Sequence, residues 1–354
     1  MAVKHWSKMQ ERGNWLGMQI LLICYRVFGR SGLWLVLFPV VFYLFLTGKT
    51  AREASYAFLT QARKVNGNHK AVTWRDSFRH FRSFADSAFD KIDAWLGRIQ
   101  QSDIIYTNET LFKELDEQQQ GAIFIGSHLG NLEVCRALSQ HRYRKVINVL
   151  VFTHHAVEFN KLLKSINPDV GINLIQVTDL GPDMAIMLKD KVEQGEIVVI
   201  VGDRTSTTTA GRVVEADFLG KPAPFSQGPF ILAALLDCPV FHLFCLKDKS
   251  AEGKRVYRVV FEKYADKLTL PRKTRQQTLQ KIVSDYAQRL SYYAAAYPYQ
   301  WFNFYDFWQN DEHAQLFGAT SRFQICCFLP VFYGLLLSIY LTVVHSTGLL
   351  VYLL

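Results

Sequence analysis

His128 and Glu133 are the residues of this chain whose types and spacing could do chemistry together. They lie five positions apart within residues 121–138, GAIFIGSHLGNLEVCRAL. A hydroxyl or amine that attacks as a nucleophile must lose a proton, and a neutral imidazole can accept it while a carboxylate holds the other ring nitrogen. The pair therefore predicts a general-base dyad, a device typically worth about 10² to 10⁴ in rate.

The local pattern predicts how this pair is positioned. Residues 122–126 are predicted as a short buried strand, residues 127–130 as its turn, and Asn131 as the cap of a helix that begins at Leu132. His128 would then lie at the carboxyl end of a strand and Glu133 in the first helical turn. The spacing alone is weak, because ten histidines and 31 acids produce it about once by chance. A turn histidine and an acid that complements the helix dipole are the alternative reading.

Strands and helices alternate along the middle of the chain. Strands are predicted at residues 145–152, 172–177, 196–201, 238–246 and 256–261, and helices at 156–166, 182–193, 228–236 and 274–296. Apolar strands that alternate with helices predict an α/β fold, with a mostly parallel central sheet flanked by helices. Ligands of such sheets bind beyond the carboxyl ends of the strands, where His128 is expected.

Two further segments follow strands of this sheet. Asp203 and Arg204 come directly after the strand at 196–201, in the same layer as His128, where a headgroup or phosphate would be held. A salt-bridged surface turn is the alternative. Residues 218–228, FLGKPAPFSQG, are predicted as a rigid loop that shapes a pocket wall. The backbone amides of residues 129–131 are the expected donors to an oxyanion.

Both ends of the chain are apolar. Residues 15–25 and 32–46 are apolar runs separated by Arg26 and Arg30, and Pro39 is expected to kink or break the second run. This pattern predicts a helical hairpin embedded in one leaflet. Residues 323–344 form 22 positions without a charge, which predicts a transmembrane helix in the tail.

Charge and cysteine usage indicate the surroundings. A net charge of +9 suits an anionic membrane surface, an acidic carrier protein or a phosphorylated substrate, and basic clusters such as Arg75, Arg79, His80 and Arg82 are candidate contacts. No nucleic-acid-binding module is present in the sequence. The six cysteines form no C-x-x-C pair, which indicates a reducing cytosol, and no metal site or cofactor is expected. The aromatic residues 297–308 fit a core segment and an interfacial belt equally well.

Four ordered segments, GSHLGNLE, VGDRTS, FLGKPAPFSQGPFILAALLDCPVF and PYQWFNFYDFW, resemble the lysophospholipid acyltransferase superfamily. More narrowly, the chain is similar over residues 4–308 to its bacterial branch related to lipid A late acyltransferases. Four segments in order are far more specific than the His and Glu spacing alone.

The resemblance implies transfer of an acyl group from a thioester, on acyl carrier protein or coenzyme A, to a hydroxyl or amine of a lipid acceptor. It implies no metal and no covalent acyl-enzyme. His128 would be the base and Glu133 its orienting partner. The substrate-binding residues it implies are Gly130, Asn131, Asp203 and Arg204.

The expected location is the bacterial inner membrane, with the catalytic domain on the cytoplasmic side. The expected domains are a membrane-associated helical region at 1–60, an acyltransferase domain at 61–310, and an apolar tail at 311–354. The tail departs from the usual pattern of the superfamily.

Three other functions are weighed against this one. A membrane-associated lipid hydrolase would need a nucleophile elbow, and the sequence contains no G-x-S-x-G. A non-catalytic protein that binds membranes or acyl carriers would need neither member of the dyad. A glycosyltransferase would need a nucleotide-diphosphate site, which no motif marks.

Overall fold

The computed structural model of the chain describes residues 15–135, 145–151, 172–177, 181–204 and 213–308. Residues Thr50–Trp308 form one compact unit, which contains the sheet. The expected acyltransferase domain at 61–310 would begin inside the helix α2 (Lys49–Val65). Phe58 and Leu59, which precede that boundary, are buried in the main core of the unit.

A seven-stranded sheet organises this unit, in the order β1-β9-β8-β2-β5-β3-β4. Neighbouring strands are parallel except for β8 and β9, which pair antiparallel. The predicted mostly parallel α/β sheet is therefore confirmed. The strands are β1 (Ile104–Thr107), β2 (Ala122–Gly126), β3 (Ile147–Val151), β4 (Ile172–Gln176), β5 (Ile197–Val201), β8 (Val240–Lys249) and β9 (Arg255–Ala265).

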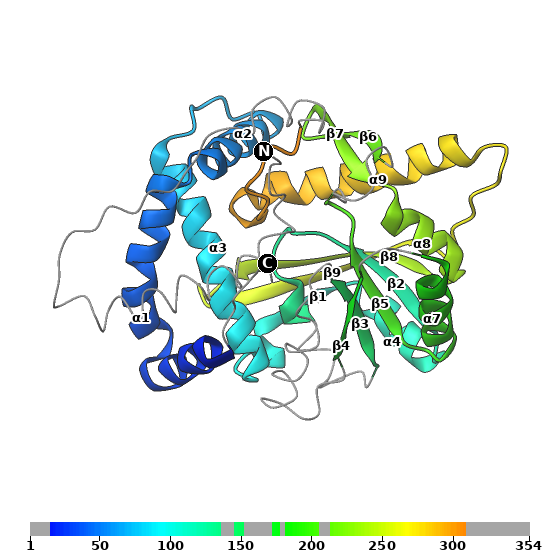
Figure 1. Ribbon diagram of the computed structural model, residues 1–354, viewed down its shortest axis with the longest axis horizontal. Coiled ribbons are helices and arrows are strands. Elements are labelled where there is room, and N and C mark those ends of the chain that lie inside the picture. Colours follow the sequence, from blue (N-terminus) through cyan, green and yellow to red (C-terminus); the bar gives the residue numbers. More distant parts are fainter. Residues whose placement is uncertain (1–14, 136–144, 152–171, 178–180, 205–212, 309–354) are drawn as a thin grey trace, which may run out of the picture. The chain divides into compact units, whose positions relative to one another are not determined.

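The two faces of the sheet bury different clusters, because successive side chains of a strand point to opposite faces. In β2, Ile123 and Ile125 join the cluster with α7, α8 and α9, whereas Ala122 and Phe124 join the cluster with α4. Figure 1 shows α7 beside α8, and α9 as a long helix of this unit. These helices are α4 (Glu109–Glu117), α7 (Pro182–Glu193), α8 (Gly228–Leu236) and α9 (Arg275–Ala296). The predicted helix at 156–166 lies outside the described residues.

The helix α3 (Trp74–Trp95) is fixed to the sheet by charge pairs and by a hydrogen bond to the turn after β2. Its buried Asp90 pairs with Lys247, near the end of β8, at 2.9 Å. It also pairs with Arg255, the first residue of β9, at 3.3 Å. The carbonyl oxygen of Ser87 accepts a hydrogen bond from the Asn131 side chain at 2.9 Å. The same helix places His80 in the interior, so the prediction that His80 belongs to a basic surface cluster is wrong.

Residues 218–228 were predicted as a rigid loop, and this prediction is wrong for most of the segment. β6 (Val213–Phe218) and β7 (Lys221–Ser226) form an antiparallel hairpin. Leu219 and Gly220 both have positive φ, as the two-residue turns that suit hairpin twist require. Within the described part of the chain this sheet has two strands, so the prolines at 222 and 224 lie on an edge strand, where proline is tolerated.

The aromatic residues 297–308 belong largely to the core. Trp301, Phe302 and Phe307 are buried, whereas Tyr305 is partly exposed. Of the two readings of this segment, the core reading is confirmed for these three residues.

Outside the compact unit, α1 (Trp15–Thr47) consists of two helical stretches joined across a kink at Gly29, where φ is 64°. Pro39, which was predicted to kink or break this run, lies inside the second stretch without breaking it. The break occurs at the glycine, which adopts positive φ without a steric penalty. Among the described residues, one stretch, Val27–Thr47, is long and apolar enough to cross a bilayer. The predicted transmembrane helix at 323–344 lies outside the described residues.

The turn after β2 is tied to β8 by a close backbone contact. Gly130 has a φ of 78° and bridges Cys245, and a Cβ placed on it would lie 1.9 Å from the Cys245 carbonyl oxygen. Gly130 therefore has a structural role, because only glycine permits both the positive φ and the contact.

We expect Gly130→Ala to lower the free energy of unfolding by about 2–4 kcal/mol, because strained φ and a backbone clash add. Gly220→Ala is the matched control, since Gly220 has the same φ of 78° but open space around it. This control should cost only about 1–2 kcal/mol. Denaturant unfolding of the purified protein in detergent measures both, and equal losses would show that the contact with Cys245 contributes nothing.

Candidate active site

The register of two neighbouring strands brings His128 and Asp203 together. β2 and β5 are parallel, and their last residues, Gly126 and Val201, are paired. His128 and Asp203 each lie two residues beyond these ends. The chain therefore delivers both side chains to the same point at the carboxyl edge of the sheet.

Two hydrogen bonds join these residues. Nδ1 of His128 lies 2.8 Å from Oδ1 of Asp203, and the backbone N–H of His128 donates to Oδ2 at 2.8 Å. Because an ionised carboxylate only accepts, Nδ1 carries the proton in this contact. The neutral ring then has its lone pair on Nε2, where a base needs it.

Two residues of the aromatic segment complete the environment of Asp203. The indole Nε1–H of Trp301 donates to Oδ2 at 3.0 Å, and the amide Nδ2 of Asn303 lies 3.4 Å from the same oxygen. Asp203 and Trp301 are fully buried, and Asn303 nearly so. The carboxylate is thus held by the backbone and side chains of three residues.

Burial and the nearby charges favour neutral His128 and ionised Asp203. Burial lowers the pKa of His128, and the nearby Arg204 lowers it further, against the opposite effect of Asp203. Burial alone would raise the pKa of Asp203, but the charge and hydrogen bonds of His128, with the charge of Arg204, bring it below its usual value. A neutral imidazole next to a carboxylate is a general base at neutral pH.

Arg204 lies at the exposed rim of this pair. Its Nε donates to Oδ1 of Asn303 at 3.3 Å, and the residue is exposed. Asn303 therefore contacts both Asp203 and Arg204, and it fixes the direction of the guanidinium relative to the pair.

Asp203 makes the hydrogen bond to Nδ1 of His128 that was predicted for Glu133. The orienting role of Glu133 stays a prediction. Glu133 lies in the first turn of the helix that begins at Leu132, as predicted, and its side chain lines a pocket. Asn131 caps this helix as predicted, since its Oδ1 accepts the N–H of Glu133 at 3.2 Å.

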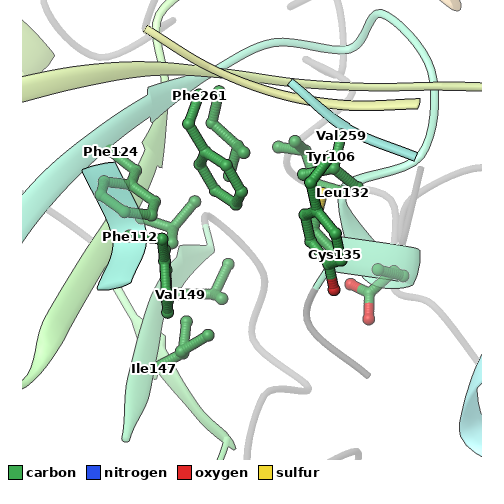
Figure 2. A pocket seen from close by; sticks show the side chains of 12 residues that line it. Tyr106, Phe112, Phe124, Leu132, Cys135, Ile147, Val149, Val259 and Phe261 are labelled. Atoms are coloured by element: carbon green, nitrogen blue, oxygen red, sulfur yellow. The ribbon is translucent and has the colours of Figure 1, made fainter. Parts of the chain in front are cut away.

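That pocket is apolar and lies on the α4 side of the sheet. Its cavity volume is about 50 Å³. Figure 2 shows the rings of Phe112, Phe124 and Phe261 on one side of the space, with Leu132 and Cys135 on the other. The remaining lining residues are Tyr106, Glu133, Ile147, Val149, Val199, Leu243 and Val259. Leu132, Glu133 and Cys135 belong to the helix that follows the His128 turn, so the pocket and His128 are connected by one segment.

The amides of residues 129–131 already have acceptors within the protein. Leu129 N–H donates to Oγ of Ser127 at 3.2 Å, Gly130 N–H to the carbonyl of Gln300 at 2.7 Å, and Asn131 N–H to the carbonyl of Cys245 at 2.8 Å. These contacts contradict the expectation that this turn supplies an oxyanion hole, because each amide has only one hydrogen to donate.

Trp301 and Asn303 are the site residues that the sequence did not assign. The available signal was their type: an indole and an amide are polar donors within an otherwise apolar aromatic stretch, and buried donors need acceptors. The segment containing them pairs antiparallel with the His128 turn, through the Leu129 and Trp301 bridge and the bond from Phe302 N–H to the His128 carbonyl at 3.0 Å. This pairing depends on tertiary structure.

Comparison with known proteins identifies the family of this chain. No curated protein matches the sequence closely enough to be counted as a relative. The family model of bacterial lipid A biosynthesis acyltransferases matches residues 79–309, which include His128, Glu133, Asp203, Trp301 and Asn303. This match covers well over half of the chain, so the protein belongs to the bacterial lipid A biosynthesis acyltransferase family and is an acyltransferase.

Proposed function

We propose that the protein transfers a fatty acyl group from a thioester, carried on acyl carrier protein or coenzyme A, to a hydroxyl or amine of a lipid acceptor, with His128 as general base. The observation that carries this proposal is the 2.8 Å contact between Nδ1 of His128 and Asp203, which leaves Nε2 as the proton acceptor. The His128 side chain is 11% exposed, so a substrate can reach it.

The steps follow from this geometry. The acceptor O–H or N–H gives its proton to Nε2 of His128 as its oxygen or nitrogen attacks the thioester carbonyl. The imidazolium formed is stabilised by the Asp203 carboxylate. The tetrahedral intermediate then collapses, the C–S bond breaks, and the thiolate takes the proton back from Nε2. The products are the acylated acceptor and the free thiol.

The surroundings suggest roles for the other predicted residues. Arg204 lies at the exposed rim, where its guanidinium could hold a phosphate of the acceptor or donor. The apolar pocket beside Glu133 could seat part of the acyl chain, since it shares its helix with the His128 turn. Gly130 and Asn131 would then act by holding this turn rather than by direct contact with substrate.

Membrane association is part of the proposal. The stretch Val27–Thr47 has the length and composition of a membrane segment, and a lipid acceptor is itself embedded in a bilayer. We infer that the protein acts at the cytoplasmic face of the inner membrane, where acyl thioesters are found.

A lipid hydrolase is less well supported. It would need a nucleophile on His128, and the adjacent Ser127 is buried, with its Oγ within hydrogen-bond distance of Leu129 N at 3.2 Å. This serine is engaged with its own turn.

The first test of the mechanism compares three variants. His128→Ala should abolish turnover, and Asp203→Asn should lower kcat by about 10³- to 10⁴-fold, because an amide at Nδ1 favours the wrong tautomer. Glu133→Gln should lower kcat less, since its side chain lines the pocket and Asp203 makes the hydrogen bond to Nδ1. Turnover is measured with an acyl carrier thioester and a detergent-dispersed lipid acceptor, after thermal unfolding confirms that each variant is folded.

Two results would contradict this mechanism. Substantial turnover by His128→Ala would remove the general base. A loss in Glu133→Gln that equals or exceeds the loss in Asp203→Asn would return the role of orienting carboxylate to Glu133.

The charge of Arg204 leads to a second prediction, which concerns the pH dependence of kcat. Activity needs neutral His128, so it falls as the pH drops through the His128 pKa, which Arg204 helps to lower. Arg204→Gln should therefore raise the pKa of His128 and move the acid limb of the kcat profile to higher pH. Arg272→Gln, at an exposed cation in the loop between β9 and α9, is the control and should leave the limb in place. An unchanged limb in Arg204→Gln would show that this charge does not act on the base.

A further inference from the structure

A chain of buried hydrogen bonds lies behind the catalytic pair and is not used by the mechanism above. Oγ of Ser77 donates to Oγ of Ser55 at 3.0 Å, Ser55 lies 3.0 Å from Nδ1 of His80, and Nε2 of His80 lies 2.8 Å from the carbonyl oxygen of Trp301. All four residues have no exposed surface. They come from α2, α3 and the segment after α9.

The contacts fix the tautomer of His80. The Trp301 carbonyl can only accept, so Nε2 of His80 carries the proton and Nδ1 accepts from the Ser55 hydroxyl. Burial lowers the pKa of His80 to about 4, against the opposite effect of the Trp301 carbonyl. The ring is therefore neutral throughout the range in which the enzyme would work, and these roles do not change there.

Trp301 connects this chain to the catalytic carboxylate. Its carbonyl accepts from His80, and its indole donates to Oδ2 of Asp203 at 3.0 Å. Its ring packs against Phe58 and Phe218, with centroids 4.6 and 4.9 Å away. The main chain of Trp301 is thus fixed by His80 while its side chain fixes Asp203.

Stability alone does not explain this arrangement. A buried hydrogen bond contributes only about 0.5–1.5 kcal/mol net, and an apolar side chain of similar shape can replace such a pair at little cost. A histidine bonded at both nitrogens does, however, define a single ring orientation and so a single position of the Trp301 main chain.

We propose that His80, oriented by Ser55 and Ser77, is a positioning residue that acts through Trp301 to hold the Asp203 carboxylate in the geometry that His128 requires. The proposal rests on the proposed function, because it assigns His80 to the same reaction. His80 does not touch the reacting atoms, so its effect should appear in turnover and in the titration of the base.

The main variant is His80→Phe, which keeps a ring but leaves the Trp301 carbonyl without its donor. We expect kcat to fall by about 10- to 100-fold with the acceptor KM unchanged, since small displacements of catalytic groups have effects of this size. A weaker indole bond leaves Asp203 more basic, so the pKa of His128 should rise and the acid limb should move to higher pH. His80→Gln should restore most of kcat, because its amide can donate to the carbonyl and accept from Ser55.

His242→Phe is the matched control. His242 is also a buried histidine whose pKa burial lowers to about 4, but it lies on β8, where its ring packs on Tyr264 at 5.2 Å and on Tyr286 at 5.5 Å rather than on Trp301. The phenylalanine ring keeps both of these aromatic contacts. The same substitution there should leave the acid limb unchanged. If His80→Phe does not fold, Ser55→Ala replaces it, with a smaller loss in the same direction.

A double-mutant cycle tests the path through Trp301. Trp301→Phe removes the indole donor, so adding His80→Phe to it should cost little more than Trp301→Phe alone. Additive losses, or a folded His80→Phe with the kcat and acid limb of the unmodified protein, would overturn the inference. Activity in His128→Ala would instead overturn the proposed function, so the two failures are distinguishable.

Discussion

The contact between His128 and Asp203 depends on one constraint, the register of β2 against β5. Parallel strands shifted by one residue would point every side chain to the other face of the sheet, and the two groups would no longer meet. The pairing of Gly126 with Val201 therefore has to be kept in register by the surrounding residues. Gly202 contributes to this, since a Cβ there would lie 2.9 Å from the ring of Tyr286. The Tyr286 hydroxyl in turn donates to the Gly126 carbonyl at 2.7 Å.

The segment after α9 acts as a partner for two different loops. It pairs with the His128 turn through its main chain, and it holds Asp203 through the side chains of Trp301 and Asn303. Because one segment contacts both the His128 turn and the loop that contains Asp203, it fixes the distance between these two loops. A carboxylate held in this way is preorganised, because it does not need to move when charge develops beside it. Preorganisation of this kind is the main source of electrostatic stabilisation in catalysis.

The sequence predicted the helices and strands better than it predicted which side chains contact one another. The helices at 182–193 and 228–236 and the central strands follow from apolar runs bounded by Gly, Pro and caps, which are local signals. His128, Asp203 and Arg204 were identified because each follows a strand. The partner of His128 could not be identified in this way, because strand order decides which strand ends are neighbours and no local pattern contains it. The hairpin at β6 and β7 was missed because its prolines suggest a loop, although its alternating burial is that of a strand.

The order of these residues along the chain has a consequence for synthesis. His128 and Asp203 are made well before Trp301 and Asn303, which lie at the very end of the compact unit. An incomplete chain would carry both members of the pair but lack the donors that hold the carboxylate, and the His128 turn would lack the strand-like partner at residues 300–302. Domains fold as units once their last segment is available. The nascent chain therefore completes the hydrogen bonds around His128 and Asp203 only when its final aromatic segment has folded back, so the candidate site is assembled together with the finished domain.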